Sequence, residues 1–355
     1  MIFYVIAFFS VIVFSSRIEF KNSSASNYVD LLFLAFFILL IIFGFRYGFG
    51  IDYHSYIGIF DRLGNNWSKE NLEPGFYYLN VIIKALGGGP YVLIFVSFFL
   101  CLLFLHKAIK DNSDFPEISY LVFFSSGLIF FYTSGIRQAI ALSMCFFSYK
   151  YIVEKSFWKF LAMVLLASSF HITALLFIPV YFFANLRYGR LFFIPLFLVS
   201  IVFIFIPNLI LTVIEPMITQ IYGDRFGNII SGALEIETQN TGLGLRIIFF
   251  NFLCVLVIYF YKELTFSQKG LLLTNFFIIG QLFSNVFGGI PDINRITLYF
   301  SIFEILFIPY TISLVKEPNI RATLYLFFFG TLSLFLIRNL QSDVYSVIPY
   351  RSIFN

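Results

Sequence analysis

Long runs of apolar residues, separated by short polar segments, make up most of this chain. The runs are continuous rather than alternating, which favours helices over the strands of a membrane barrel. Because about 20 mostly apolar residues cross the core of a bilayer as a helix, the pattern predicts an all-α, polytopic integral membrane protein. We count about twelve transmembrane helices, within a range of roughly 11–13. The expected spans are residues 2–14, 31–45, 91–105, 118–131, 139–153, two within 157–183, 191–206, 245–261, 270–286, 296–314 and 322–337.

Two segments need a separate interpretation. Residues 76–86 are amphipathic, too short to span, and end in a Gly-Gly-Gly-Pro sequence, so we expect a short re-entrant or interfacial helix there, on the outer face. Residues 157–183 are long for one span and short for two. We favour two short spans, which place His171 at a membrane face. A single tilted span would place His171 at mid-depth and would move every later loop to the opposite side of the membrane.

Composition agrees with this pattern. The 355 residues are 60% hydrophobic and 12% charged, with 53 Phe and 22 Tyr, whereas soluble proteins carry about 25% charged residues. We therefore expect one polytopic domain over residues 1–355 instead of a series of soluble domains. The three cysteines lie scattered in apolar runs and provide neither a disulfide framework nor a paired-thiol motif.

The basic residues fall into two sets when successive loops are assigned to alternate sides of the membrane. The positive-inside rule places the larger, lysine-rich set in the cytoplasm, which puts both termini and the loops 46–90 and 207–244 outside. Arginine binds phosphate through a planar fork, so the arginine-rich outer set indicates an anion site, to which both loops contribute. The cytoplasmic set is Arg17, Lys21, Lys107, Lys110, Lys150, Lys155, Lys159, Arg187, Arg190, Lys262, Lys269, Lys316 and Arg321; the outer set is Arg46, Arg62, Lys69, Lys84, Arg137, Arg225, Arg246, Arg295, Arg338 and Arg351.

Polar side chains that carry chemistry gather in several outer segments. The densest is residues 46–56, which directly follow an apolar run, and others surround Arg137, His171 and Arg295. Ionisable residues at membrane depth are candidates for function by default. The candidate site residues are Arg46, Asp52, Tyr53, Tyr56, Glu73, Arg137, Gln138, His171, Asn294 and Arg295.

These candidates also have purely structural interpretations. Arg46 and Arg295 stand at span boundaries, where an arginine can anchor a helix by extending its head group to the interface. Asp52 is well placed to cap a short helix, and His171 could be a core histidine bonded to a neighbouring carbonyl. Tyrosines gather at membrane interfaces in general, although the two that follow Asp52 most closely could stack on sugar rings.

Several common motifs are absent from the sequence. It has no Walker A loop, no dinucleotide-binding glycine fingerprint, no serine-hydrolase elbow and no His-Glu-x-x-His zinc motif. It therefore carries no sequence signal of ATP hydrolysis, zinc chemistry or a metal-held nucleotide sugar. We expect an anionic, lipid-borne substrate that is reached from outside, and no metal, cofactor or nucleic acid.

Five short motifs follow one another in a characteristic order. They are R-x5-D-x3-Y from Arg46, E-P-x-F from Glu73, I-R-Q from Ile136, H-x-T-A from His171 and N-R from Asn294. In this order, within a Phe- and Tyr-rich polytopic chain, they resemble the EpsG-like, Wzy-type polysaccharide polymerases. The resemblance runs from about residue 46 to about residue 299 and covers most of the chain. The loop 207–242 matches only in character, and the first span and the tail after residue 338 add nothing.

The resemblance implies a multi-pass enzyme of the bacterial inner (cytoplasmic) membrane, with its active site facing the periplasm or outside. Such polymerases transfer a growing glycan from undecaprenyl pyrophosphate to the non-reducing end of the next lipid-linked repeat unit. Their products include the O-antigen of lipopolysaccharide, capsule and exopolysaccharide. They are metal-independent glycosyltransferases without a cofactor. The expected partners are the undecaprenyl-pyrophosphate-linked oligosaccharide donor and acceptor, membrane lipid and a chain-length regulator protein.

The chemistry of transfer from a pyrophosphate suggests a role for each candidate. Cations should face the leaving group as its negative charge grows. Arg137 and Arg295, followed by Arg46, are the candidates, because guanidinium forks suit phosphate oxygens. A base must take the proton of the acceptor hydroxyl, and both Asp52 and His171 are candidates. The residues expected to bind substrate or to orient the arginines are Glu73, Gln138, Asn294, Tyr53 and Tyr56.

Three other functions stay open. An O-antigen ligase would share the donor and the arginines and differ in its acceptor. A lipid-linked oligosaccharide transporter should show repeated halves or broken spans in matching positions, which the sequence lacks. A membrane acyltransferase with one catalytic histidine would depend on His171 and little on the arginines.

Overall fold

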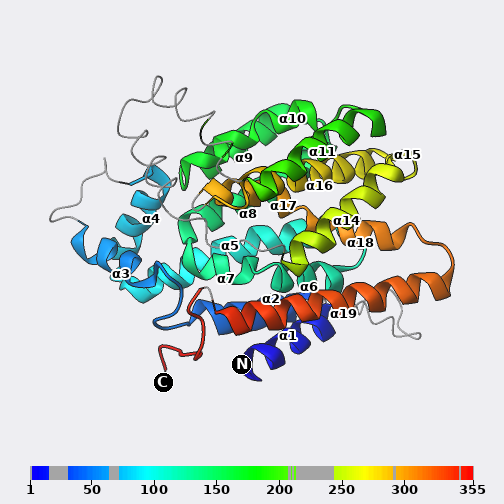
Figure 1. Cartoon of the computed structure of the whole chain (residues 1–355). Helices are drawn as coiled ribbons and strands as arrows, with labels where there is room; N and C mark the ends of the chain where they lie inside the picture. The colour runs from blue at the N-terminus through cyan, green and yellow to red at the C-terminus, as the bar shows by residue number, and fades with distance from the viewer. Residues whose placement is uncertain are drawn as a thin grey trace, which may run out of the picture. The chain divides into compact units, whose positions relative to one another are not determined.

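The structure is a computed structural model that describes residues 2–15, 31–63, 72–206, 244–290, 293–343 and 345–354, together with positions 209 and 212. Helices account for most of these residues (Figure 1), and the all-α prediction is confirmed. The chain divides into two compact units, one of Met1–Tyr181 with Glu304–Asn355 and one of Phe182–Phe303. The single domain expected over residues 1–355 stays a prediction.

Four described helical stretches are long and apolar enough to cross a membrane: α5 (Pro90–Asn112), α16 (Gln268–Phe287), Ile293–Ser313 and α19 (Pro318–Ser342). A bent pair of helices raises this number to five if the pair counts as one span. Further apolar helices in the described chain have only 10–17 residues. The predicted count of about twelve spans is therefore not confirmed, because several apolar runs form helices that are short or broken.

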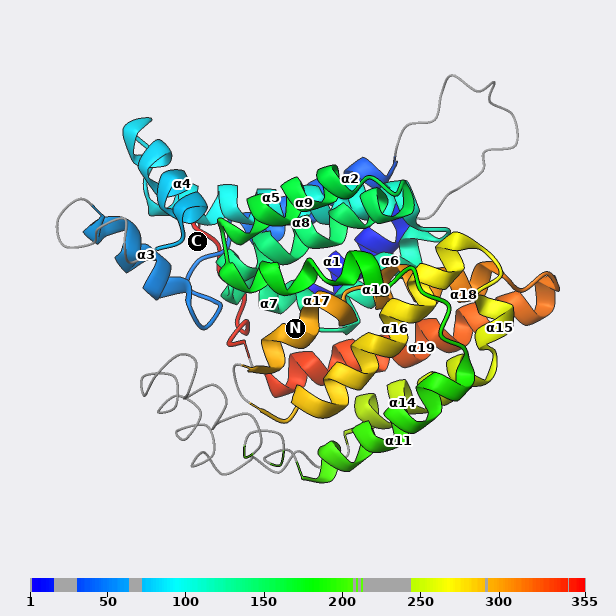
Figure 2. The same ribbon diagram turned by 90° about the horizontal axis from the view of Figure 1, so that it is seen from above.

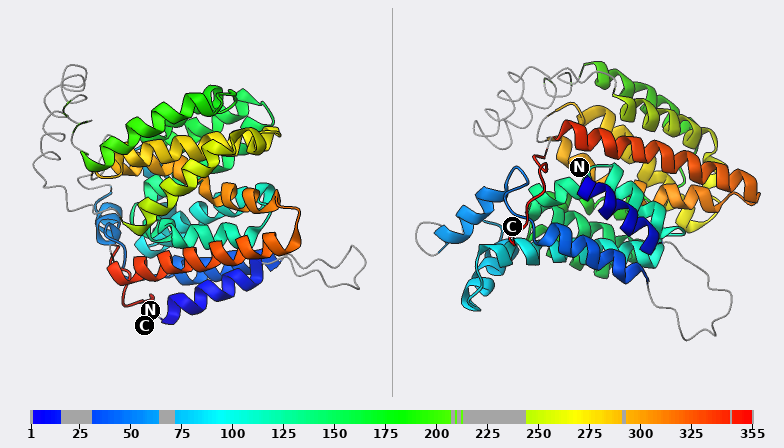
Figure 3. Two further views of the ribbon diagram at one scale, coloured as in Figure 1. Left: turned by 45° about the vertical axis from the view of Figure 1, so that its right-hand side comes forward. Right: turned by 90° about the horizontal axis from the view of Figure 1, so that it is seen from below.

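Two central helices, α5 and α8 (Ile136–Val153), pack against each other to form the core of the first unit (Figure 2). At the chain ends, α1 (Ile2–Ser15) packs on α2 (Leu31–Gly44), which in turn packs on α5. The first and last helices of the unit also lie near each other (Figure 3), since the rings of Phe8 in α1 and Phe329 in α19 have centroids 6.4 Å apart. The helix α18 (Glu304–Ser313) packs on α6 (Pro116–Ser125), which is buried at every position.

The apolar run at residues 118–131, expected as one span, is broken. The helices α6 and α7 (Leu128–Ser134) meet at an angle of 60°. Gly127 stands between them with φ +79°, a left-handed conformation that glycine adopts without strain. The break leaves the Ser125 carbonyl without a helical partner, and Asn339 Nδ2 of α19 donates a hydrogen bond to that oxygen at 2.8 Å. A long-range contact thus stabilises the kink.

The polar segment after α2 contains two short helices, α3 (Tyr53–Arg62) and α4 (Pro74–Ala85), of 10 and 12 residues. The short amphipathic helix predicted at residues 76–86 is present as α4. Proline at the first position of α4 and of α5 supplies the backbone angle that starts a helix, and glycines separate the two. Their apolar faces share one buried cluster with α5; its members include Tyr53, Tyr56, Phe60, Phe76, Ile83, Leu93 and Ile94.

Residues 157–183 double back on themselves. The helix α9 (Phe157–Ser168) ends just before His171, and a 3₁₀ helix η2 (Ile172–Phe177) and the short α10 (Val180–Phe183) follow. The ring centroids of Phe157 and Tyr181 lie 5.1 Å apart, and those of Phe160 and Phe177 lie 5.8 Å apart. Residues far apart along this stretch are therefore neighbours, as expected for two short antiparallel segments with His171 at the turn.

The second unit consists of helices that surround α16. They are α11 (Arg190–Phe205), α14 (Leu245–Tyr259), α15 (Tyr261–Leu264), the 3₁₀ helix η3 (Ile293–Thr297) and α17 (Leu298–Ser301). A buried polar network joins three of them. Asn285 Nδ2 of α16 donates to Asn251 Oδ1 of α14 at 2.8 Å and to Ser200 Oγ of α11 at 3.0 Å. In lipid there is little hydrophobic driving force for helices to pack together, and side-chain hydrogen bonds of this kind stabilise their association.

Candidate functional site

The N-terminal end of α8 carries an ion pair between two of the predicted site residues. Arg137 is the second residue of α8, and its Nη1 atom lies 2.6 Å from Oε2 of Glu73, which precedes α4. The two side chains are 30% and 19% exposed, so the pair is reachable from the surface. Segments 64 residues apart in the chain thus meet at one polar point.

A third motif joins the same point through α3. The Tyr56 hydroxyl is hydrogen-bonded to the Arg137 side chain, and burial raises the pKa of this tyrosine although the guanidinium charge opposes the rise. The Arg137 guanidinium also lies over the Phe76 ring, 6.0 Å from its centroid. An acid, a phenol and an aromatic face therefore fix the orientation of one partly exposed cation.

The His171 turn is tied to the same region by backbone. The amide of Gly75 donates to the Ser169 carbonyl oxygen at 2.7 Å. A Cβ at Gly75 would lie 2.8 Å from that oxygen, so the approach requires glycine. At the turn itself, His171 Nδ1 shares a hydrogen bond of 2.7 Å with Thr173 Oγ1. Glu73 and His171 therefore stand on two segments that touch directly.

Arg46 lies beneath this surface instead of on it. Arg46 is 1% exposed. Its Nη1 atom donates to the carbonyl oxygen of Phe43 at 2.8 Å, and its Nη2 atom donates to that of Thr133 at 3.0 Å. Burial lowers the pKa of the guanidinium to about 10, which still leaves it charged near neutrality. Gly50 approaches the Thr133 carbonyl as well, with φ +101°. The segment after α2 is thus fastened to the end of α7, just before Arg137.

The C-terminal tail holds the Arg46 segment in place through backbone hydrogen bonds. The sequence did not suggest this contact. Arg46 and Ser352 form an isolated antiparallel bridge, in which the amide of Tyr47 donates to the Arg351 carbonyl at 2.9 Å. The Tyr350 hydroxyl donates to the Ile42 carbonyl at 2.9 Å. Backbone pairing does not require particular side chains, so it leaves no motif in the sequence. The sequence therefore gave no indication that this tail contributes to the site.

The neighbouring candidates differ in exposure. Asp52 directly precedes α3 and is partly exposed, and its side chain makes no hydrogen bond that caps the helix, contrary to the structural interpretation considered above. The rings of Tyr53 and Tyr56 are 1% and 5% exposed and belong to the apolar cluster of α3, α4 and α5. Gln138 is 5% exposed. Asp52 therefore offers a carboxylate to the surface, whereas the two tyrosines present little ring surface for stacking on a sugar.

Asn294 and Arg295 belong to the second unit and are described apart from the others. They lie in η3. The backbone N–H of Asn294 donates to the Ile290 carbonyl at 2.9 Å, and Arg295 is exposed. The outer loop 207–244 lies outside the described residues except for positions 209, 212 and 244. Four of the five motifs thus meet in the first unit, through contacts that involve Arg46, Tyr56, Glu73, Arg137 and the His171 turn.

Comparison with known proteins confirms the family resemblance that the sequence suggested. A search of curated proteins gave no match, and neither did a search of solved structures. The sequence model described as the EpsG family matches residues 29–352, nearly the whole chain. Together with its apolar helices, this match indicates a multi-pass membrane protein with a function in polysaccharide biosynthesis. The chain belongs to the EpsG family.

Proposed function

We propose that this protein polymerises oligosaccharide repeat units carried on undecaprenyl pyrophosphate. In this proposal the growing glycan leaves its lipid pyrophosphate and joins the non-reducing end of the next lipid-linked unit. The reaction takes place at the outer or periplasmic face of the bacterial inner membrane and needs no metal. Membership of the EpsG family supports the general class of reaction, and the lipid-linked substrate is our inference from the arginine-centred site.

The contact between Arg137 and Glu73 is the observation that carries the proposal. A glycosyl transfer from pyrophosphate develops negative charge on the leaving oxygen, and a preorganised cation nearby lowers the barrier. Arg137 is partly exposed, is oriented by Glu73 and Tyr56, and presents a planar fork that suits phosphate oxygens. Arg137 is therefore the main pyrophosphate ligand of this proposal, whereas Arg295, which belongs to the other unit, stays a prediction from the sequence.

Arg46 takes a different role from the one suggested by the sequence. Because its guanidinium is buried on two backbone carbonyls, we assign it the positioning of the α7–α8 junction rather than contact with phosphate. The substrate is then expected to meet the surface formed by Asp52, Glu73, Arg137 and the His171 turn. Gln138, which is 5% exposed, is assigned to orienting Arg137, and Asn294 stays a predicted ligand of sugar hydroxyls.

The acceptor hydroxyl must lose a proton as its oxygen attacks the anomeric carbon. The new carbon–oxygen bond forms while the bond to the pyrophosphate oxygen breaks, and undecaprenyl pyrophosphate departs with the electron pair. Asp52 is one candidate base, since its carboxylate is partly exposed and does not cap α3. His171 is the other. If its Nδ1 donates to Thr173, the Nε2 atom of the neutral ring carries the lone pair that accepts a proton.

The glycan pattern of cells tests the proposal. The gene is deleted and restored as wild type, Arg137→Ala or Arg137→Lys, and membrane glycans are separated on a gel. We expect deletion and both variants to leave a single repeat unit on its acceptor, with normal amounts of the variant proteins. Full-length polymer left on the lipid carrier would instead indicate a ligase, and an absence of units at the outer face would indicate a transporter. Either result would overturn the proposal.

A further inference from the structure

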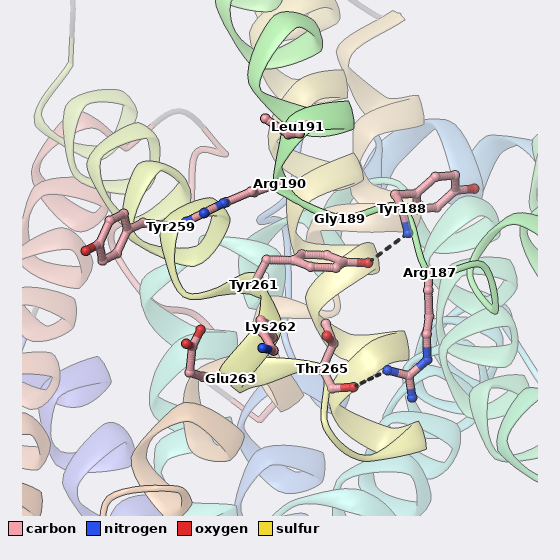
Figure 4. Close-up of a pocket in the computed structure, with 10 residues that line it drawn as sticks. All are labelled: Arg187, Tyr188, Gly189, Arg190, Leu191, Tyr259, Tyr261, Lys262, Glu263 and Thr265. Carbon is pink, nitrogen blue, oxygen red and sulfur yellow. Dashed lines mark hydrogen bonds between the residues drawn. The ribbon is translucent and has the colours of Figure 1, made fainter.

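A pocket of about 590 Å³ opens at one end of the second unit, where α11 begins and α14 ends (Figure 4). Its walls come from the link between α10 and α11 and from the turn that contains α15. The positive-inside rule assigns the cations of these segments to the cytoplasmic side. The helix α16 starts at this end and is followed at its other end by η3, which holds Arg295. Twenty helical residues separate the two ends by about 30 Å, so within this unit the pocket lies far from Arg295.

Three cations and one acid line this pocket. Arg187, Arg190 and Lys262 are exposed, as is Glu263, so the lining carries a net positive charge. Figure 4 shows Arg190 extending toward Tyr259 on one side, with Arg187 on the other side. Arg187 Nη1 donates to the Thr265 carbonyl at 3.3 Å, which fixes the guanidinium at the wall. The cations therefore surround the open space instead of being scattered over a flat surface.

The floor of the pocket is a buried hydrogen-bond network. The Tyr261 ring, which lies between the two arginines in Figure 4, is 5% exposed. Its hydroxyl donates to Asn275 Oδ1 at 2.9 Å and accepts from the Tyr188 amide at 3.3 Å. Asn275 Nδ2 in turn donates to the carbonyls of Ala184 and Leu186, each at 2.9 Å. The link that carries Arg187 and Arg190 is thus rigidly attached to α16, and the pocket is formed before any ligand binds.

The rim of the pocket is apolar. Leu191 is 81% exposed and Tyr259 is 64% exposed, and both line the opening. Phe192 and Phe260, their chain neighbours, are 46% and 47% exposed. Large exposed apolar side chains beside a cationic pocket match the boundary between lipid chains and head groups, where aromatic residues gather. A ligand that fits both surfaces has an anionic head and hydrocarbon chains.

We infer that this pocket binds the phosphate of an anionic glycerophospholipid, with its acyl chains lying along the exposed faces of α11 and α14. Basic pockets between membrane helices on the cytoplasmic side recognise anionic head groups in this way. The inference does not depend on the proposed polymerase reaction, since it concerns the opposite end of α16. Free phosphate shares the head-group chemistry and lacks the chains, so the two sources can be separated by experiment.

A competition experiment on the full-length protein in neutral detergent tests the inference. The probe is a short-chain phosphatidylglycerol with a fluorophore on one acyl chain, followed by fluorescence anisotropy. We expect unlabelled phosphatidylglycerol to displace the probe, and phosphatidylcholine and inorganic phosphate at the same concentration to leave it bound. The double variant Arg187→Gln/Arg190→Gln should bind the probe roughly 30-fold more weakly, because each basic side chain strengthens binding to anionic lipid by about fivefold. Glu263→Gln should bind it more tightly, because it removes the one acid of the lining.

The matched control is Lys107→Gln/Lys316→Gln, which removes two exposed cations of the same predicted face outside the pocket. Equal weakening by this control would show attraction to the whole surface and would overturn the inference. Displacement by inorganic phosphate alone would show a free-anion site and would also overturn it. If the arginine double variant does not fold, unchanged affinity in Glu263→Gln is the result that contradicts a phosphate in the pocket.

Discussion

The Nη1 atom of Arg137 lies 2.6 Å from Oε2 of Glu73, and this ion pair joins α8 to the start of α4. Both side chains are partly exposed, so the pair contributes little to folding, less than about 1 kcal/mol. Its importance is orientation. The acid holds a fork-shaped cation at the surface, beside the turn that carries His171. Because the pair contributes little to stability but fixes the position of the guanidinium, its loss should change activity more than the free energy of unfolding.

The first prediction concerns this carboxylate. Glu73→Gln keeps a hydrogen-bond acceptor and loses the charge, so we expect an approximately tenfold slower polymerisation, the difference between a charged and a neutral hydrogen bond. The rate is measured with purified enzyme on a lipid-linked repeat unit. Glu317→Gln, which changes an exposed acid at the start of α19, is the control and should be fully active. A fully active Glu73→Gln enzyme would show that Arg137 does not need this partner.

The second prediction separates Arg46 from Arg137. Arg46→Met leaves the buried carbonyls of Phe43 and Thr133 without their donor, so we expect the free energy of unfolding to fall by about 3 kcal/mol. Arg137→Met should change unfolding far less and abolish activity. Thermal unfolding in detergent, measured beside activity, distinguishes the two. A stable but inactive Arg46→Met protein would instead indicate that Arg46 contacts the phosphate directly.

The third prediction tests the approach of Gly75 to Ser169. A Cβ at Gly75 would lie 2.8 Å from a backbone oxygen that cannot move without shifting the turn. We expect Gly75→Ala to destabilise the protein by about 1–3 kcal/mol through overpacking and to lower activity by displacing His171. Gly330→Ala is the control, because a Cβ there meets nothing within 4 Å in α19, and it should stabilise the helix by up to about 1 kcal/mol. Equal effects of the two changes would contradict the close approach.

The fourth prediction addresses the choice of base. If His171 is the base, its Nδ1 donates to the Thr173 hydroxyl, which holds the ring and its tautomer. Thr173→Val removes that partner with little change in volume and should slow polymerisation about tenfold, whereas Thr173→Ser should stay active. Asp52→Asn is measured alongside. Loss of activity in Asp52→Asn with a fully active Thr173→Val enzyme would assign the base to Asp52.

Each short motif keeps its residues on one local element, so the sequence could group them; that they form the active site stays a prediction. The segments of Tyr56, Glu73, Arg137 and His171 were all expected at one face, and in the first unit contacts join the four segments. The burial of Arg46 could not be read from the sequence, because its partners are carbonyl groups at the end of α7, 87 residues away, and at the end of α2, which precedes it. An arginine at a span boundary looks the same whether it faces phosphate or backbone.

The predicted span count is not confirmed for a related reason. Hydropathy measures how apolar a run is, not whether its helix continues. Residues 118–131 are apolar throughout, yet Gly127 breaks the helix and Asn339 stabilises the break from a distant helix. At residues 157–183 the chain turns back at His171, in line with the two segments that the charge pattern favoured; that both cross the membrane stays a prediction. Local patterns therefore predicted the helices and their polar turns, and tertiary contacts decided where the helices end.

The fifth prediction concerns the sides of the membrane. The charge pattern places Arg62 outside and Lys316 inside, and both side chains are exposed. Cysteine at Arg62 should react with an impermeant thiol reagent added to intact cells whose outer membrane has been permeabilised, and cysteine at Lys316 should react only after the inner membrane is lysed. The native Cys101, Cys145 and Cys254 are buried and should give little background. The reverse labelling pattern would place the Arg137 site in the cytoplasm, where a glycan polymerase of the outer face cannot act.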